Sequence, residues 1–127
     1  MAADQTAMLL YETCLLNIVE EKNGIREIDF QEAVELLESG RKFVWLGKEP
    51  ADYIARLLEL DAGIAEKAEP QEIFGADRFR ALEFSDCIFV CYHGNTSRAV
   101  AKLLKDRHNV ESYSLKGGVT AVVGEIF

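Results

Sequence analysis

The chain of 127 residues is long enough for one compact domain and too short for two ordinary ones. Its composition, 49% hydrophobic and 28% charged, is typical of a water-soluble globular protein. The 14 Lys and Arg against 22 Asp and Glu give a net charge of −8, which repels phosphate backbones and anionic lipid at long range. We therefore expect no nucleic-acid partner and no membrane partner.

The N-terminus and the cysteines indicate a cytoplasmic protein. Asp4 and Glu12 interrupt the opening residues, which therefore lack the basic start and apolar run of a secretory signal. No stretch approaches the length of a transmembrane helix. The three cysteines, Cys14, Cys87 and Cys91, are an odd number, which favours free thiols in a reducing compartment over a disulfide framework.

Residues 5–22 place apolar side chains at helical spacing and precede a stop signal, Asn23-Gly24. The same Asn-Gly pair would also suit a hairpin turn between residues 14–20 and 25–28, and the pattern leaves both open. We treat residues 1–25 as an N-terminal extension packed on the domain, and residues 26–127 as the domain itself.

Strands and helices alternate along the rest of the chain. A capping box at Asp29 and Glu32 predicts a helix that ends at Gly40, and Pro50 opens another that runs to about residue 60. The other expected elements are a strand at 42–46, short helices and loops over 61–85, a strand at 87–91, a helix at 97–107, a strand at 110–115 and a short helix from Gly117-Gly118 to 123. This order predicts an α/β fold with a central, mainly parallel sheet and helices on both faces.

The strand at 87–91 is apolar on both faces, as expected of a central parallel strand. In such a sheet, ligands bind beyond the carboxyl ends of the strands, where Cys91 lies. The polar turn of residues 92–96 can aim successive amide N–H groups inward, and the next helix adds the positive end of its dipole. These groups favour a thiolate and an anion beside it, so Cys91 is a candidate nucleophile.

Each candidate also has an ordinary structural explanation. A cysteine that ends an apolar strand is usually a small buried hydrophobe, and only the loop makes catalysis the better hypothesis for Cys91. His93 would contact a donor or simply be solvated, and Thr96 and Ser97 would bond a persulfide or only cap the helix. Arg98, and Lys102 one turn later, would attract an anionic donor or be surface charges.

Cys87 is expected to be a core residue. It lies four residues before Cys91, which along a strand is about 13 Å at roughly 3.3 Å per residue. A disulfide needs α-carbons within about 7 Å, so the two cysteines cannot bridge without unravelling the strand. Cys14 is expected to be a core or surface thiol, and His108 a residue at a helix end.

Two segments resemble the active-site loop and closing helix of single-domain rhodaneses, which are sulfurtransferases. They are Phe89-Val90-Cys91-Tyr92-His93-Gly94-Asn95-Thr96-Ser97-Arg98-Ala99 and Leu115-Lys116-Gly117-Gly118-Val119. The resemblance covers residues 26–123, strongly over 86–119 and by strand and helix order before that. It implies a rhodanese-like domain, Cys91 as the catalytic residue, and a substrate-binding loop of Tyr92, His93, Gly94, Asn95, Thr96, Ser97 and Arg98.

The resemblance also implies a reaction in two displacements at sulfur. The Cys91 thiolate takes the outer sulfur of thiosulfate or a similar small anionic donor and becomes a persulfide, and a thiol or cyanide then accepts that sulfur. No metal and no organic cofactor is expected. A protein that donates or accepts sulfur is a further partner left open.

The chain departs from the family pattern at two places. Residues 45–48 replace the family's Asp-x-Arg-like element and no Gly-His-Ile-Pro-like segment follows, so the contacts behind the loop are expected to differ. Val122 stands where the family often has an aromatic residue. Neither change touches the cysteine loop.

Two other functions compete with sulfur transfer. A cysteine-dependent phosphatase or arsenate reductase would use a similar amide loop, but it places an arginine six residues after the cysteine, where this chain has Ser97 and only then Arg98. A sulfur carrier or protein-interaction module without turnover is the other alternative. The missing Asp-x-Arg-like element and the N-terminal segment keep that alternative open.

Overall fold

The structure is a computed structural model that describes residues 25–125, and it is built around one five-stranded sheet. The strands are β1 (Arg26–Ile28), β2 (Phe43–Trp45), β3 (Ala65–Lys67), β4 (Ile88–Val90) and β5 (Tyr113–Leu115). Their order is β1-β5-β4-β2-β3, and every neighbouring pair is parallel. Strand β4 is therefore central, and all of its residues are buried.

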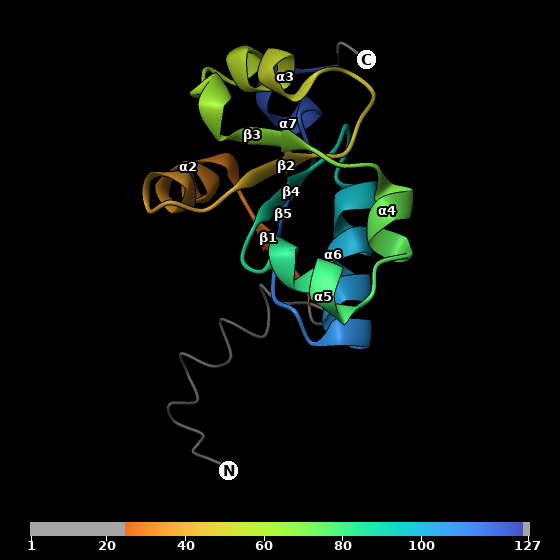
Figure 1. The fold of residues 1–127 in the computed structure, drawn as a ribbon. Coiled ribbons are helices and arrows are strands. Elements are labelled where there is room, and N and C mark those ends of the chain that lie inside the picture. Colours follow the sequence, from red (N-terminus) through yellow and green to blue (C-terminus); the bar gives the residue numbers. More distant parts are fainter. Residues whose placement is uncertain (1–24, 126–127) are drawn as a thin grey trace, which may run out of the picture.

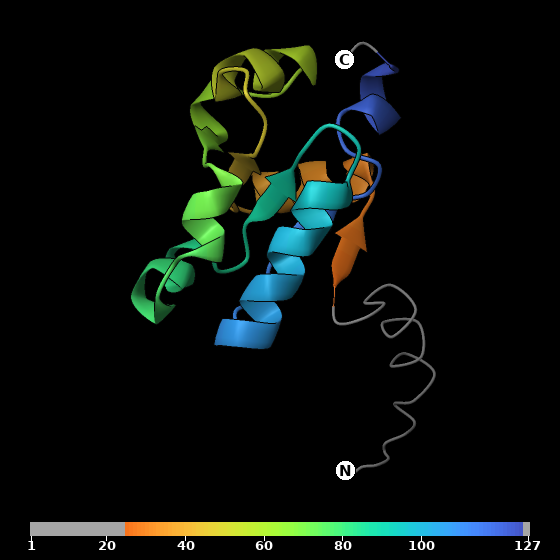
Figure 2. The same ribbon diagram turned by 90° about the vertical axis from the view of Figure 1, so that its right-hand side faces the viewer.

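Helices cover both faces of this sheet (Figures 1 and 2). Helices α4, α5 and α6 lie on one side, and α2, α3 and α7 lie on the other. Their bounds are α2 (Phe30–Glu38), α3 (Ala51–Leu57), α4 (Pro70–Phe74), α5 (Arg78–Ala81), α6 (Asn95–His108) and α7 (Thr120–Val123), with short 3-10 turns at Ala62–Ile64 and Leu82–Phe84. The α/β fold with helices on both faces is confirmed.

Alternation along the central strands divides the core into two clusters. Val44 and Phe89 face α4, α5 and α6, where they meet Val100 and Leu104 of α6. Their neighbours in the strands face the opposite way and pack on α2, α3 and the start of α7: these are Phe43, Trp45, Ile88 and Val90. Because successive strand side chains point to opposite faces, apolar residues at every position require cover on both sides.

Several predicted elements form as expected. Helix α2 begins with the predicted capping box, in which Asp29 accepts the N–H of Glu32 at 2.8 Å and Glu32 accepts the N–H of Asp29 at 3.0 Å. It ends just before Gly40, whose φ of +102° is incompatible with a continued α-helix. The central strand, the short helices between residues 61 and 85, and the short helix after Gly117-Gly118 are confirmed as well.

Other boundaries were wrong, and one strand was missed. Strand β3 forms within the segment expected to hold only helices and loops, because pairing with β2 makes up for its weak apolar pattern. Helix α3 ends at Leu57 rather than near residue 60, since Glu59 adopts a φ of +61°. Helix α6 begins two residues early at Asn95, and β5 begins at Tyr113 rather than at 110.

The first strand bears on the hairpin alternative. Residues 26–28 form β1, which pairs in parallel with β5. The other half of that hairpin, the helix expected at 5–22 and the packing of the extension over residues 1–24 lie outside the described residues. Over residues 25–125, no helix has both the length and the apolar character needed to cross a membrane.

Candidate active site

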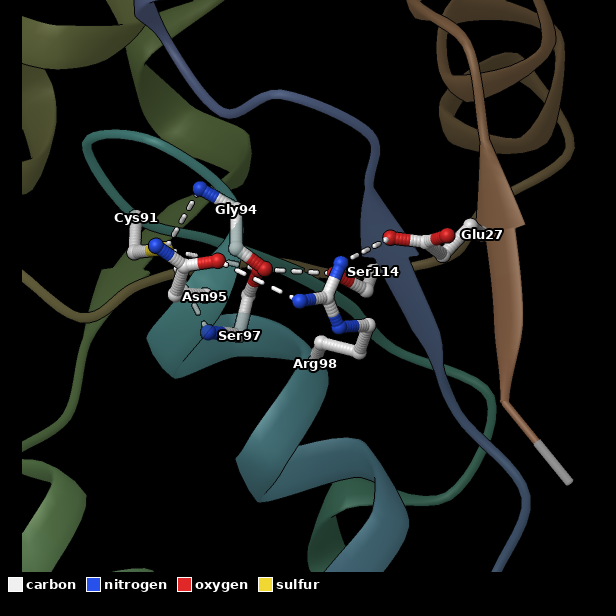
Figure 3. Close-up of polar contacts among 7 residues, drawn as sticks. All are labelled: Glu27, Cys91, Gly94, Asn95, Ser97, Arg98 and Ser114. Carbon is white, nitrogen blue, oxygen red and sulfur yellow. Dashed lines mark hydrogen bonds and ion pairs between the residues drawn. The ribbon is translucent and has the colours of Figure 1, made fainter. Parts of the chain in front are cut away.

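Cys91 follows the central strand β4 and faces the first turn of α6, as Figure 3 shows. Its Sγ accepts a hydrogen bond from the N–H of Gly94 at 3.1 Å and another from the N–H of Ser97 at 3.3 Å. The Ser97 hydroxyl lies 3.4 Å from the same sulfur. Two N–H groups from one short loop therefore donate to the Cys91 sulfur, the Ser97 hydroxyl lies beside it, and Cys91 is 4% exposed.

Glycines allow the loop to curl around the sulfur. Gly94 has a φ of +92°, which turns its N–H toward Cys91, and a Cβ there would lie 2.8 Å from the Gly117 nitrogen. Gly118 has a φ of +67°, and its Cβ would lie 2.4 Å from the carbonyl oxygens of both Cys91 and Tyr92. The Gly-Gly turn thus packs backbone to backbone against the loop.

The start of α7 fixes the first peptide groups of the loop. The N–H of Val119 donates to the Cys91 carbonyl at 3.0 Å, and the N–H of Thr120 donates to the Tyr92 carbonyl at 3.1 Å. With both carbonyls held from outside, the backbone on either side of Cys91 cannot rotate freely. This explains why the Gly-Gly motif accompanies the cysteine loop.

A buried pair of hydroxyls lies behind the sulfur. Ser97 Oγ is 2.7 Å from Oγ of Ser114 on β5 and donates to the Gly94 carbonyl at 3.3 Å. Both serines are 0% exposed. Buried hydroxyls require hydrogen-bond partners, and here each serine supplies one for the other.

The remaining N–H groups of the loop are candidates to bind an anion. Among the hydrogen bonds of residues 25–125, none uses the backbone N–H of His93, Asn95 or Thr96 as donor. Asn95 and Thr96 are the first residues of α6, where N–H groups have no acceptor within the helix and the helix dipole is positive. An anionic group beside Cys91 would meet donors from the same turn.

Tyr92 anchors the loop to the segment that follows β2. Its hydroxyl donates to Glu49 Oε1 at 2.7 Å and accepts the N–H of Lys48 at 2.9 Å, and its ring packs edge-on against Trp45. Burial, helped by the hydrogen bond to Glu49, raises the pKa of the Tyr92 hydroxyl. Tyr92 therefore holds the loop from outside through a neutral hydroxyl.

The basic side chains Arg98, His93 and Lys102 lie beside carboxylates rather than against the sulfur. Arg98 reaches from α6 to Glu27 on β1, with its Nη1 3.1 Å from Oε2, and donates to Asn95 Oδ1 at 3.2 Å (Figure 3). His93 is exposed, with Nε2 3.5 Å from Glu125 Oε1. Lys102 pairs with Asp106 one turn further along α6 at 2.6 Å, as expected of a charge on a helix surface.

The two hydroxyls expected near the sulfur differ in position. The hydroxyl of Ser97 lies beside Cys91, whereas Thr96 is exposed and its side chain makes no hydrogen bond within residues 25–125. Thr96 therefore offers the site its backbone N–H rather than a placed hydroxyl. The exposed Thr96 side chain can contact a sulfur donor that arrives from solvent.

Cys87 has no part in this arrangement. It is 1% exposed, packs with the α4, α5 and α6 cluster and forms no disulfide with Cys91. Burial raises its pKa far above the ordinary value, so the thiol stays protonated. Cys14 lies outside the described residues. Within residues 25–125, no three His, Cys, Asp or Glu side chains gather as metal ligands would.

Sequence reasoning missed four residues that shape the site: Glu27, Glu49, Ser114 and Gly118 in its role as the backbone contact. Ser114 carried a signal, since a hydroxyl in a buried strand needs a partner. The two glutamates carried none, because surface carboxylates are common and their partners are distant in the chain.

Comparison with known proteins supports the fold. The chain resembles a rhodanese homologue from the extremely thermophilic bacterium Thermus thermophilus at 25% identity and a TM-score of 0.52, over 74% of this chain and 96% of that one. A rhodanese-related protein from Thermoplasma volcanium is 20% identical with a TM-score of 0.49, over 80% of this chain and 93% of that one. No protein-family model matches the chain. No curated protein matches it either.

Proposed function

We propose that this chain, which resembles a rhodanese homologue in fold, is a thiosulfate sulfurtransferase with Cys91 as its sulfur carrier. The observation that carries the proposal is the convergence of the Gly94 N–H and the Ser97 N–H on one sulfur atom, with the Ser97 hydroxyl 3.4 Å from it. Donors fixed in this way stabilise negative charge on sulfur, and a thiolate is the nucleophile that sulfur transfer needs.

In the first half-reaction, the Cys91 thiolate attacks the outer sulfur of thiosulfate. The new S–S bond forms as the old one breaks, and its electron pair leaves with sulfite, so Cys91 becomes a persulfide anion. In the second half-reaction, cyanide or a thiolate attacks the outer sulfur, and the electron pair returns to Cys91. In both steps the cysteine carries one negative charge before and after, as a thiolate or as a persulfide anion. The same loop donors stabilise that charge throughout.

The loop residues have distinct proposed roles. Gly94 and Ser97 hold the sulfur, while the N–H groups of His93, Asn95 and Thr96 bind the anionic end of the donor. Tyr92 and Arg98 keep the loop in shape through Glu49 and Glu27. His93 and the Thr96 side chain are exposed, and we assign them contact with the incoming donor.

The phosphatase or arsenate reductase alternative lacks its central group. Such enzymes need a guanidinium aimed at the oxyanion beside the cysteine. Arg98 is the arginine in the first turn of α6, and it binds Glu27 and Asn95 instead. The position six residues after Cys91 holds Ser97, whose hydroxyl contacts the sulfur.

A turnover assay tests the proposal. We expect the full chain to convert thiosulfate and cyanide into sulfite and thiocyanate, and the Cys91→Ser variant to lose this activity at least a thousandfold. The Cys87→Ala variant is the matched control and should keep the activity, since Cys87 lies in the core at the opposite end of β4 from the loop.

Two results would contradict the proposal. If Cys91→Ser turned over like the wild type, Cys91 would not carry the sulfur. If the wild type accepted sulfur from a cysteine desulfurase but not from any small donor, the protein would be a carrier rather than a thiosulfate sulfurtransferase.

A further inference from the structure

We propose that Ser114 is a positioning residue, which orients the Ser97 hydroxyl so that its hydrogen points to the Cys91 sulfur. Ser114 belongs to β5, a different element from the loop, and its Oγ lies 2.7 Å from Ser97 Oγ. The inference rests on the proposed function because it takes Cys91 as the reacting sulfur.

The direction of the bond between the two serines decides what Cys91 receives. Ser97 has one hydroxyl hydrogen and three neighbours within hydrogen-bond distance: Cys91 Sγ at 3.4 Å, the Gly94 carbonyl at 3.3 Å and Ser114 Oγ at 2.7 Å. If Ser97 donated to Ser114, the nearest of the three, its hydrogen would be unavailable to a thiolate. If Ser114 donates, that hydrogen is free for the sulfur.

Burial favours donation by Ser114. Its side chain is 0% exposed, and within residues 25–125 Ser97 Oγ is the one hydrogen-bond partner of its hydroxyl. A buried O–H without an acceptor is costly, so the Ser114 hydrogen points to Ser97 Oγ. Once the sulfur is ionised, the charge draws the Ser97 hydrogen to it in preference to the neutral Gly94 carbonyl.

The result is a chain of two hydroxyls that ends on the sulfur. Ser114 donates to Ser97, and Ser97 donates to the Cys91 thiolate or to the persulfide derived from it. Each bond polarises the next, so the Ser114 hydroxyl strengthens the hydrogen bond from Ser97 to the sulfur without contacting the sulfur itself. When Cys91 is a neutral thiol, its S–H donates to Ser97 Oγ at the same 3.4 Å, and the Ser97 hydrogen turns to the Gly94 carbonyl.

The test is a double-mutant cycle on Cys91 alkylation, measured in the full chain by iodoacetamide modification of the Cys91 peptide. Ser97→Ala should slow alkylation at pH 7 roughly tenfold, as the loss of a bond to a charged group does. Ser114→Ala should slow it about two- to threefold, with the lost rate returning at higher pH. In the Ser97→Ala background, Ser114→Ala should have no further effect on the rate.

Two controls separate this role from a general packing effect. Ser112 is also buried, but its hydroxyl has no hydrogen-bond partner among residues 25–125, so Ser112→Ala should leave the alkylation rate unchanged. Ser114→Cys leaves no cavity, since the thiol is slightly larger than the hydroxyl, but it is a weaker donor and should reproduce the loss seen with alanine. It also keeps the cycle measurable if Ser114→Ala does not fold.

The assignment is overturned if Ser114→Ala and Ser114→Cys react like the wild type, or if Ser114→Ala slows alkylation equally with and without Ser97. Because alkylation needs no sulfur donor, the two proposals fail separately. The expected cycle in a protein that forms no persulfide would support Ser114 and defeat the proposed function. Persulfide formation together with additive effects of the Ser97 and Ser114 substitutions would support the proposed function and defeat the assignment of Ser114.

Discussion

Cys87 and Cys91 flank the same strand, and the groups around their sulfur atoms differ. Cys87 lies between the sheet and the helices α4 and α6, where burial raises its pKa and keeps it neutral. Cys91 lies one strand length further, where the chain leaves the sheet and two N–H groups and a hydroxyl reach its sulfur. Position relative to the strand end, rather than residue type, separates a core residue from a candidate nucleophile.

The raised pKa of Cys87 makes stability depend on pH. The unfolded thiol ionises near its ordinary value of 9.0, while the folded thiol keeps its proton. The unfolded state is therefore stabilised as pH rises above that value, and the free energy of unfolding falls by about 1.4 kcal/mol near pH 10. Urea unfolding at pH 7.5 and pH 10 should show this additional loss in the wild type and not in Cys87→Ala; equal losses in both would contradict it.

Sequence reasoning could single out Cys91 as a candidate nucleophile, but it could identify the residues around the sulfur only in part. The strand end and the polar glycine turn pointed to the sulfur, and the hydroxyl of Ser97 lies where the loop pattern placed it. The partners of Arg98 could not be foreseen, because Glu27 is 71 residues away in the chain and meets Arg98 only through the order of the strands. The pairing of Ser97 with Ser114 depends on the same order.

At the scale of elements, the loop after β4 and the turn before α7 form one unit. The turn supplies the N–H groups that hold the carbonyls of Cys91 and Tyr92, and its glycines allow the two backbones to touch. Neither segment would keep its shape alone, since the loop has positive-φ glycine geometry and α7 has only four residues.

We expect Gly118→Ala to break this unit. Its Cβ would lie 2.4 Å from two carbonyl oxygens, and its φ is positive, so the free energy of unfolding should fall by roughly 3 kcal/mol and sulfur transfer should be lost. Gly40→Ala is the control, because Gly40 also has a positive φ but nothing within 4 Å. It should cost only about 1 to 2 kcal/mol and keep activity. Equal effects of the two substitutions in urea unfolding and turnover would contradict the account.

Sequence patterns predicted the elements best where local and tertiary preferences agree. The capped helix α2 and the apolar strand β4 satisfy both. The edge strand β3 has only three residues, two of them exposed, so its strand form depends on pairing with β2. The end of α3 depends on the positive φ of Glu59, and the sequence has no glycine or asparagine there that would predict it.

For the whole molecule, charge is the dominant long-range property. The net charge of −8 repels a thiosulfate dianion, and Arg98 beside the loop is paired with Glu27. The long-range field therefore opposes the approach of an anionic donor, whereas the N–H groups of the loop act at short range.

This charge balance predicts the effect of salt. We expect kcat/KM for thiosulfate to rise about twofold as NaCl increases from about 20 to about 200 mM, because salt screens the repulsion. With an uncharged organic trisulfide as donor, the same change of salt should have little effect. A rate that falls with salt for thiosulfate would show that local cations, and not the net charge, govern encounter.

The most direct test of the account is to find the sulfur itself. After incubation with thiosulfate and removal of excess donor, intact-mass and peptide mass spectrometry should show one added sulfur atom on the Cys91 peptide, removable by a thiol reductant. Cys91→Ser should carry none, and Cys87→Ala should carry it as the wild type does. An added sulfur that persists in Cys91→Ser, or one located on Cys87, would contradict the claim that the donors around Cys91 make it the reacting sulfur.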